Sequence, residues 1–186
     1  FLKNTDRSNS LWMTPIEGSK ALFVTEDPLD AIAHSQLFPG ARYAYLCTGG
    51  TSTKAQREMI HSFSQKFKLP IILGNDNDLA GQLENFKLAY HTANIEYAIN
   101  SKTQRVLLTV NGAEREWGKD EIVAALQAVM KQRPNMILSI PWAKDWNDDL
   151  RSSKKSISLR IAENMVRAQI ETTKSEQRGM IAGKLP

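Results

Sequence analysis

Short apolar runs recur along this chain, and each run leads into a turn and then a segment with helical apolar spacing. Four of these runs, each five or six residues long, span residues 21–25, 42–47, 70–75 and 136–141. Runs of that length suit buried strands. Strands that alternate with amphipathic helices form parallel sheets covered by helices on both faces. The sequence therefore predicts an α/β fold with a mostly parallel sheet of about four strands.

Local signals indicate where the helices begin and end. Asp27 is followed by Pro28, and an aspartate cap before a proline at the first helical position favours a helix start. Pro39 and Gly40 end that helix. Further helices are expected at 53–66, from Leu79 to about Ile99, and at 119–131.

Composition divides the chain into three segments. Residues 1–19 are polar and are expected to be a linker or the tail of a preceding domain. Residues 20–150 hold the alternating strands and helices, with an insertion at about 100–134 that contains the apolar run 105–110. Residues 151–186 are expected to form a basic C-terminal helix and tail.

Length and composition exclude several classes of protein. The 186 residues, of which 41% are hydrophobic, suit one domain with a single core. The single cysteine, Cys47, excludes an intramolecular disulfide and a multi-cysteine zinc site within this chain. No run of about 18 apolar residues occurs, and the first residues lack the apolar stretch of a secretory signal. We therefore expect a cytoplasmic protein without a membrane span.

Positive charge is concentrated at the C-terminal end of the chain. Residues 151–186 contain eight Lys or Arg and three Asp or Glu, whereas residues 1–150 are nearly balanced. A basic appendage beside a balanced body suits a polyanionic partner, and a solvated helix face is the simpler alternative. Lys154, Lys155 and Arg160 are the candidate contacts to DNA or RNA in this segment.

Acidic residues stand directly after three of the predicted strands. They are Glu26, Asp76 with Asp78, and Asp145 with Asp148. Residues at the carboxyl ends of parallel strands converge in space, and clustered carboxylates repel one another unless a cation or a proton offsets their charge. Oxygen ligands suit Mg²⁺ or Mn²⁺, which bind phosphate substrates at the same time. The pattern therefore predicts a metal site that acts on a phosphate compound.

Three segments that contain these acidic residues resemble motifs of a known family. In chain order they are Glu26-Asp27-Pro28-Leu29-Asp30-Ala31, Asp76-Asn77-Asp78-Leu79-Ala80-Gly81 and Lys144-Asp145-Trp146-Asn147-Asp148. They resemble the Toprim family of primases, topoisomerases and related nucleases. They are most similar to the Toprim modules of primase-like proteins encoded on plasmids and conjugative elements. The resemblance covers about residues 20–150 and implies a Toprim-like, Rossmann-like fold.

The resemblance also implies roles for individual residues. Glu26 matches the first-strand glutamate that acts as general acid or base in that family. Asp76 and Asp78 match the Asp-x-Asp pair that binds Mg²⁺. Asp30 and the pair Lys144-Asp145 resemble additional metal-site or phosphate-site positions of primases.

A simpler interpretation exists for each acidic residue on its own. Asp27 and Asp30 suit a helix cap and an acid in the first turn, where they favour the helix dipole. Asp78 suits a cap of the next helix, and Asn147 or Asp148 suits a cap of the last one. Taken singly, each of these is the better interpretation. Their joint occurrence at three successive strand ends favours an active site.

The predicted function is Mg²⁺-dependent phosphoryl transfer on nucleic acid, of the primase, topoisomerase or nuclease type, in plasmid or mobile-element DNA processing. A replicative primase also needs a zinc-ribbon module, which the single cysteine excludes here, and a topoisomerase needs a nucleophilic tyrosine in a separate domain. We therefore expect an isolated Toprim module or a fragment that works with other domains or subunits.

Two alternatives stay open at this point. One is a non-catalytic accessory module that binds a metal or a nucleotide within a DNA-processing complex. The other is a phosphohydrolase of the haloacid-dehalogenase kind, because ILGNDNDLAG also places Asp-x-Asp after a strand. That family places its nucleophilic aspartate on the first strand of the fold, with Gly-Thr or Gly-Val after the second aspartate, and neither feature is present.

Overall fold

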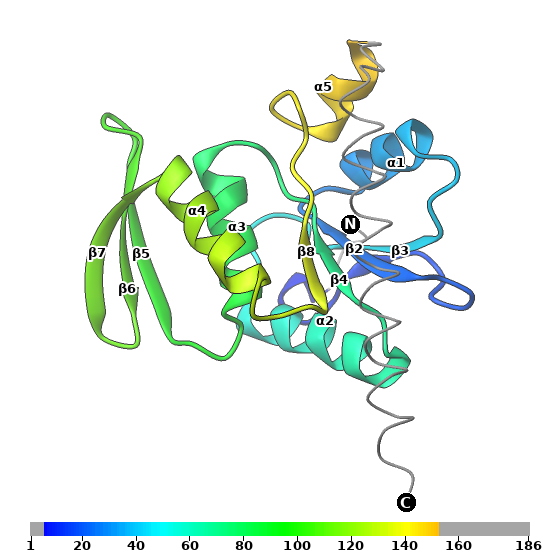
Figure 1. Ribbon diagram of the computed structural model, residues 1–186, viewed down its shortest axis with the longest axis horizontal. Helices are drawn as coiled ribbons and strands as arrows, with labels where there is room; N and C mark the ends of the chain where they lie inside the picture. The colour runs from blue at the N-terminus through cyan, green and yellow to red at the C-terminus, as the bar shows by residue number, and fades with distance from the viewer. Residues whose placement is uncertain (1–5, 153–186) are drawn as a thin grey trace, which may run out of the picture.

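The computed structural model describes residues 6–152, and its main feature is a five-stranded sheet in the order β1-β3-β2-β4-β8 (Figure 1). The strands are β1 (Trp12–Met13), β2 (Ala21–Thr25), β3 (Tyr43–Cys47), β4 (Ile71–Leu73) and β8 (Met136–Leu138). The last four are parallel, and β1 runs antiparallel along β3 at one edge. The predicted mostly parallel α/β fold is therefore confirmed, with one strand more than the four expected.

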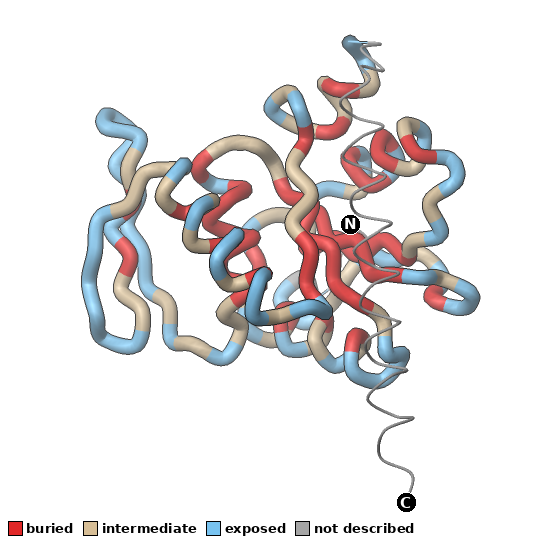
Figure 2. The backbone as a smooth tube through the Cα atoms, viewed as in Figure 1, coloured by how far each residue is buried: buried red, intermediate tan, exposed pale blue. Residues whose placement is uncertain are grey.

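The sheet is buried on both faces. Alternate residues of β2 contribute to two separate cores, because successive side chains of a strand point to opposite faces. Leu22 and Val24 pack in a core with side chains of α2 (Lys54–Phe67), α3 (Leu79–Ala89) and α4 (Lys119–Met130). Phe23 packs in a second core with α1 (Pro28–Leu37) and α5 (Trp146–Arg151). Figure 2 shows the buried residues gathered along these central strands.

Aspartate caps start three of the five α-helices within residues 6–152, two of them at the places that the sequence indicated. The Asp27 side chain accepts a hydrogen bond from the backbone N–H of Leu29, and Pro28 is the first helical residue of α1. Asp78 caps α3 through the N–H of Gly81. Helix α5 is capped by Asp145, and not by either of the two residues, Asn147 and Asp148, that the sequence offered as caps.

The prediction of one helix from Leu79 to about Ile99 is wrong for the second half of that range. Helix α3 ends at Ala89, and the chain then forms β5 (Ile95–Asn100). This strand pairs antiparallel with β6 (Arg105–Val110), which pairs with β7 (Ala113–Gly118) in a separate three-stranded sheet. Isoleucine and tyrosine in residues 95–99 favour a strand, and pairing with β6 provides hydrogen-bond partners for the backbone of this segment. The added unit of the structure therefore begins at β5.

The first and last segments of the chain are described only in part. Trp12–Met13 pairs with β3 and Ile16 is buried in the core, so this part of residues 1–19 is built into the domain. The predicted C-terminal helix and tail, with its basic residues, lies outside the described residues from 153 onward. Within residues 6–152, no helix has the length and apolar character needed to cross a membrane.

Gly81 allows α3 to begin directly beside the loop that follows β4. A Cβ atom at this position would overlap the carbonyl oxygen of Asp76 and lie 2.6 Å from its backbone nitrogen. We expect Gly81→Ala to reduce the free energy of unfolding by about 1–3 kcal/mol, because backbone cannot yield as a flexible side chain can. Urea denaturation measures this effect.

Gly118→Ala is the matched control for this substitution. A Cβ atom at Gly118 would meet only ends of flexible side chains, at 3.4 Å from Arg105 and 3.6 Å from Glu121. We expect a smaller loss of stability in this variant, since those side chains are free to shift. Equal losses in the two variants would contradict the tight approach of α3 to Asp76.

Candidate acidic site at the carboxyl ends of the strands

Glu26 directly follows β2, and its backbone is held by the glycine turn after β3. The N–H of Gly49 donates a hydrogen bond of 2.8 Å to the carbonyl oxygen of Glu26. Gly49 and Gly50 have φ angles of +70° and +120°, which favour glycine over residues with a side chain. The turn therefore approaches the backbone of Glu26 closely, and no backbone N–H within residues 6–152 donates to the Glu26 carboxylate.

The loop after β4 is fixed at both sides. The side-chain amide of Gln82 donates to the carbonyl oxygen of Asp76 at 2.8 Å, and the N–H of Asn77 donates to the carbonyl oxygen of Lys144 at 2.7 Å. The second of these bonds joins the loop after β4 to the loop after β8. The segments that contain the Asp-x-Asp and Lys-Asp motifs are therefore in direct contact.

Helix α5 connects the third acidic segment to the first. The N–H of Asn147 donates to Oδ1 of Asp30 at 3.3 Å, which ties the start of α5 to the first turn of α1. Trp146 is buried, and its indole N–H donates to the carbonyl oxygen of Gly74 at 2.7 Å. These two bonds hold Asp145, the cap of α5, near the loop after β4.

The carboxylates of the three segments act on one another. Burial, together with the negative charges of four neighbours, raises the pKa of Asp76 to about 7; the neighbours are Asp30, Asp78, Asp145 and Glu26. Burial also raises the pKa of Asp30 to about 6, together with the charges of Asp145, Asp27 and Glu26. The structure thus brings Glu26, Asp30, Asp76, Asp78 and Asp145 into one acidic cluster.

The pKa of Glu26 is also raised by the negative charge of Glu84, a residue that the sequence did not indicate as part of the site. The Glu26 pKa is raised first by burial and then by the charge of Glu84 on α3. Glu84 is buried, accepts hydrogen bonds from the backbone and hydroxyl of Ser52, and pairs with Lys87 at 2.6 Å. No local pattern marks Glu84, because its partner Ser52 is 32 positions away in the chain.

Asp148 and Asp149 are adjacent in the sequence but lie in different surroundings. Asp148, a predicted metal ligand, is half-exposed and lies 3.9 Å from the guanidinium of Arg151. Asp149, which the sequence did not single out, is buried and accepts two backbone hydrogen bonds from Trp142 and Ala143. Among residues 6–152, no group of three or more His, Cys, Asp or Glu side chains is arranged to hold a metal ion directly.

Two lysines reach the acidic cluster. The ammonium of Lys144, a predicted phosphate contact, lies 3.8 Å from the Asp78 carboxylate. The ammonium of Lys119 lies 3.4 Å from the backbone and side-chain oxygens of Asn77, between the two aspartates of the motif. Lys119 begins α4 in the added unit, and no sequence signal linked it to Asn77. The other predicted contacts to nucleic acid, Lys154, Lys155 and Arg160, lie outside the described residues.

The cap interpretation accounts for only part of the cluster. Asp78 and Asp145 each use one carboxylate oxygen to cap a helix, and the second oxygen of each accepts no hydrogen bond from a described residue. The carboxylates of Glu26 and Asp76 cap no helix, and within the described residues nothing donates to them. Among residues 6–152, the five carboxylates with one ion-paired ammonium, that of Lys144, keep an excess of negative charge, and such oxygen donors fit a hard divalent cation such as Mg²⁺ or Mn²⁺.

The raised pKa of Asp76 predicts how stability depends on pH in the presence of a chelator. Its folded-state pKa of about 7 exceeds the ordinary value of 3.8, so the folded protein binds more protons and loses stability as pH rises through that window. We expect the stability of Asp76→Asn relative to the wild type to increase as the pH rises from 3.8 to about 7 and to stay constant above it. Thermal unfolding of both proteins across this range measures the difference.

The comparison of the two proteins also removes the contribution of the buried histidines. Burial lowers the pKa of His34 to about 3 and that of His61 to about 4, and these groups change stability in the opposite sense below about pH 6.5. Both histidines are present in wild type and variant, so their effects cancel in the difference. Parallel pH profiles would show that Asp76 is an ordinary solvated carboxylate.

Residues 23–105 match the family model of a Toprim-like domain, which is less than half of the chain. The matched range contains Glu26, Asp30, Asp76 and Asp78, and it ends before Lys144 and Asp145. No curated protein and no solved structure matches the chain. Residues 23–105 are therefore similar to a Toprim-like domain, and they lie within the mixed α/β fold described above.

Proposed function

We propose that the acidic cluster is the active site of a Mg²⁺-dependent enzyme that transfers phosphoryl groups on DNA or RNA. The observation that carries this proposal is the gathering of four carboxylates around Asp76, whose pKa rises to about 7 because of burial and their negative charge. Such a cluster is costly in the absence of a cation. The Toprim-like match over residues 23–105 supports nucleic acid as the substrate.

Asp76 and Asp78 would hold the metal ion, with Asp30 and Asp145 beside them and Asp148 further out on α5. When bound, Mg²⁺ or Mn²⁺ orients and neutralises phosphate oxygens. Mg²⁺ retains several waters and uses only one or two protein carboxylates together with substrate phosphates. A site with few direct protein ligands is therefore compatible with this ion.

Glu26 is the residue that would move the proton to or from the reacting hydroxyl. Burial and the charges of Glu84 and Asp78 raise its pKa, which brings a carboxylic acid closer to the range of a general acid or base. Lys144 lowers the pKa of the same group and opposes these effects. The ammonium groups of Lys144 and Lys119 are placed to contact a phosphate beside the cluster.

The basic segment 151–186 would contact the nucleic-acid backbone through Lys154, Lys155 and Arg160. Release of counterions from the polymer when lysine or arginine meets phosphate is the physical basis. We further propose a setting in plasmid or mobile-element DNA processing in the cytoplasm, with other domains or subunits supplying what a lone Toprim-like domain lacks.

Divalent-metal binding tests the cluster separately from catalysis. Asp76→Asn with Asp78→Asn removes two charges, and asparagine at position 78 still caps α3. We expect Mg²⁺ to stabilise the wild type, by about 2.7 kcal/mol at 100 times the dissociation constant, and to stabilise the double variant much less. Thermal unfolding with and without Mg²⁺ measures the gain. An equal gain in both proteins would place the metal elsewhere.

Glu26→Gln tests the chemical step, because glutamine keeps the size of the side chain and removes the titratable proton. We expect metal-dependent turnover of a nucleic-acid substrate to fall by about 10²- to 10⁴-fold while binding of the substrate persists. Primer synthesis and strand cleavage assays in Mg²⁺ measure the rates of the two reactions.

Glu17→Gln is the matched control, since Glu17 is exposed and precedes β2 instead of following it. We expect this variant to retain full turnover. Metal and nucleic-acid binding by a wild type without any turnover would identify a non-catalytic binding module. Equal loss of turnover in the two variants would contradict the proposed role of Glu26 as the general acid or base.

A further inference from the structure

Trp142 has a solvent-exposed indole in the loop that leads to Lys144 and Asp145. Its exposed fraction is 67%, the largest among the exposed large hydrophobic residues of the described chain. Isolated exposed apolar residues are ordinary on protein surfaces, so exposure alone assigns no role. What distinguishes Trp142 is the way its backbone is held and the residues that follow it.

The backbone of Trp142 is fixed by a buried carboxylate. Asp149 is only 3% exposed, and its two oxygens accept hydrogen bonds from the N–H groups of Trp142 at 2.7 Å and Ala143 at 2.6 Å. Burial of a carboxylate is costly unless such bonds compensate it. The acidic cluster does not use Asp149, and the effect of these bonds is to hold one short loop in place.

The same loop is fixed again at its far end. The carbonyl oxygen of Lys144 accepts the N–H of Asn77, and Asp145 caps α5. Trp142 is two residues before Lys144, and that separation spans at most about 7 Å of extended chain. The ammonium of Lys144 is itself 3.8 Å from Asp78. Trp142 therefore has a fixed backbone in the loop between β8 and α5, and the same loop carries the lysine that reaches Asp78 (Figure 1).

We propose that Trp142 stacks on a base of single-stranded nucleic acid and so positions the neighbouring phosphate at the acidic cluster. This inference rests on the proposed action on nucleic acid and adds that the reacting strand is unpaired at that base. Every base has a π face, so stacking on tryptophan tolerates any sequence. Lys144, between the indole and the cluster, supplies the cation for the backbone that joins base and phosphate.

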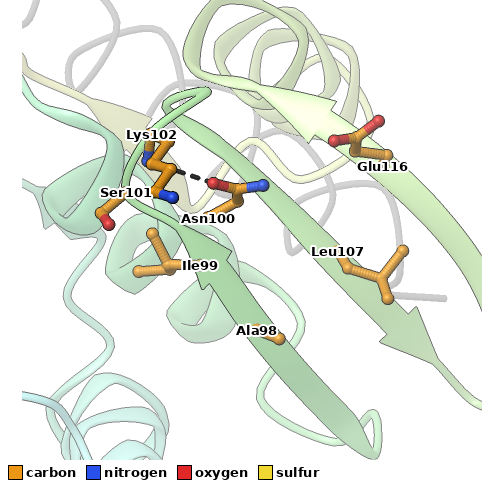
Figure 3. Close-up of a pocket in the computed structure, with 7 residues that line it drawn as sticks. All are labelled: Ala98, Ile99, Asn100, Ser101, Lys102, Leu107 and Glu116. Carbon is orange, nitrogen blue, oxygen red and sulfur yellow. Dashed lines mark hydrogen bonds between the residues drawn. The ribbon is translucent and has the colours of Figure 1, made fainter.

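The hollow on the added sheet does not offer the same chemistry. It has a volume of about 560 Å³ and is lined by residues of β5, β6 and β7 and of the β5–β6 turn, including Ala98, Leu107 and Glu116 (Figure 3). None of its lining side chains is aromatic. A base has no stacking partner there, whereas Trp142 presents one next to the candidate metal ligands.

Binding to two oligomers of equal length separates base stacking from backbone contact. The probes are a fluorescent oligothymidylate and an oligomer in which the bases are replaced by abasic residues, both titrated with the full chain in Mg²⁺. We expect Trp142→Ala to bind oligothymidylate about 5- to 100-fold more weakly than the wild type, with little change for the abasic oligomer. Trp142→Phe should restore part of the affinity, because phenylalanine keeps an aromatic face.

Phe67→Ala is the matched control, since Phe67 is an aromatic residue with 38% exposure at the far end of α2. This variant should bind both oligomers as the wild type does. Oligothymidylate should also quench the tryptophan fluorescence of the wild type and quench that of Trp142→Phe less. Thermal unfolding should be unchanged in Trp142→Ala, because the side chain is largely in solvent.

The outcomes distinguish the two proposals. Unchanged binding of oligothymidylate by Trp142→Ala, or an equal loss for both oligomers, would overturn the stacking role and leave the proposed function intact. A wild type that binds neither oligomer would overturn the action on nucleic acid and the stacking role with it. A loss confined to the oligomer that carries bases is the result that supports the inference.

Discussion

Repulsion among carboxylates at one edge of a parallel sheet is the constraint on which the rest of the site depends. The register pairs Val24 with Leu73, and Leu73 with Leu138, so β2, β4 and β8 end at the same level and the residues that follow them must meet. Because those residues are acidic, burial and mutual charge raise the pKa of Asp76 to about 7. This repulsion destabilises the folded protein, so other interactions must keep the cluster in place. A bound cation would relieve the repulsion.

Those interactions are hydrogen bonds between the three loops and the helices that follow them. The N–H of Gly49 binds the backbone of Glu26, the N–H of Asn77 binds that of Lys144, and the N–H of Asn147 binds the carboxylate of Asp30. Each bond joins two segments that are distant in sequence, and at least one of the two carries a member of the cluster. A site held in this way needs little rearrangement before a ligand binds, which lowers the cost of binding.

Local signals in the sequence sufficed for the helix starts and the acidic strand ends, and they failed wherever a distant partner decides the structure. The caps at Asp27 and Asp78 are visible because the capped N–H groups lie two or three residues away. The sequence predicts a helix where β5 lies, because no local signal indicates that this segment pairs with β6. The place of Lys119 at the Asp-x-Asp loop depends on the same added unit, 42 positions along the chain.

Neighbouring aspartates in the last acidic segment show why residue type alone does not assign a role. Asp145 caps α5 with one oxygen and acts electrostatically on Asp76, so a helix cap and membership of the cluster are compatible in one side chain. Asp148 is half-exposed near Arg151, whereas Asp149 is buried and binds the loop that carries Trp142. The difference follows from helical geometry, since adjacent residues on a helix point about 100° apart and one turn of α5 faces both the loop and the solvent. Position on the helix, and not the carboxylate itself, decides which aspartate acts on the cluster and which one shapes the surface beside it.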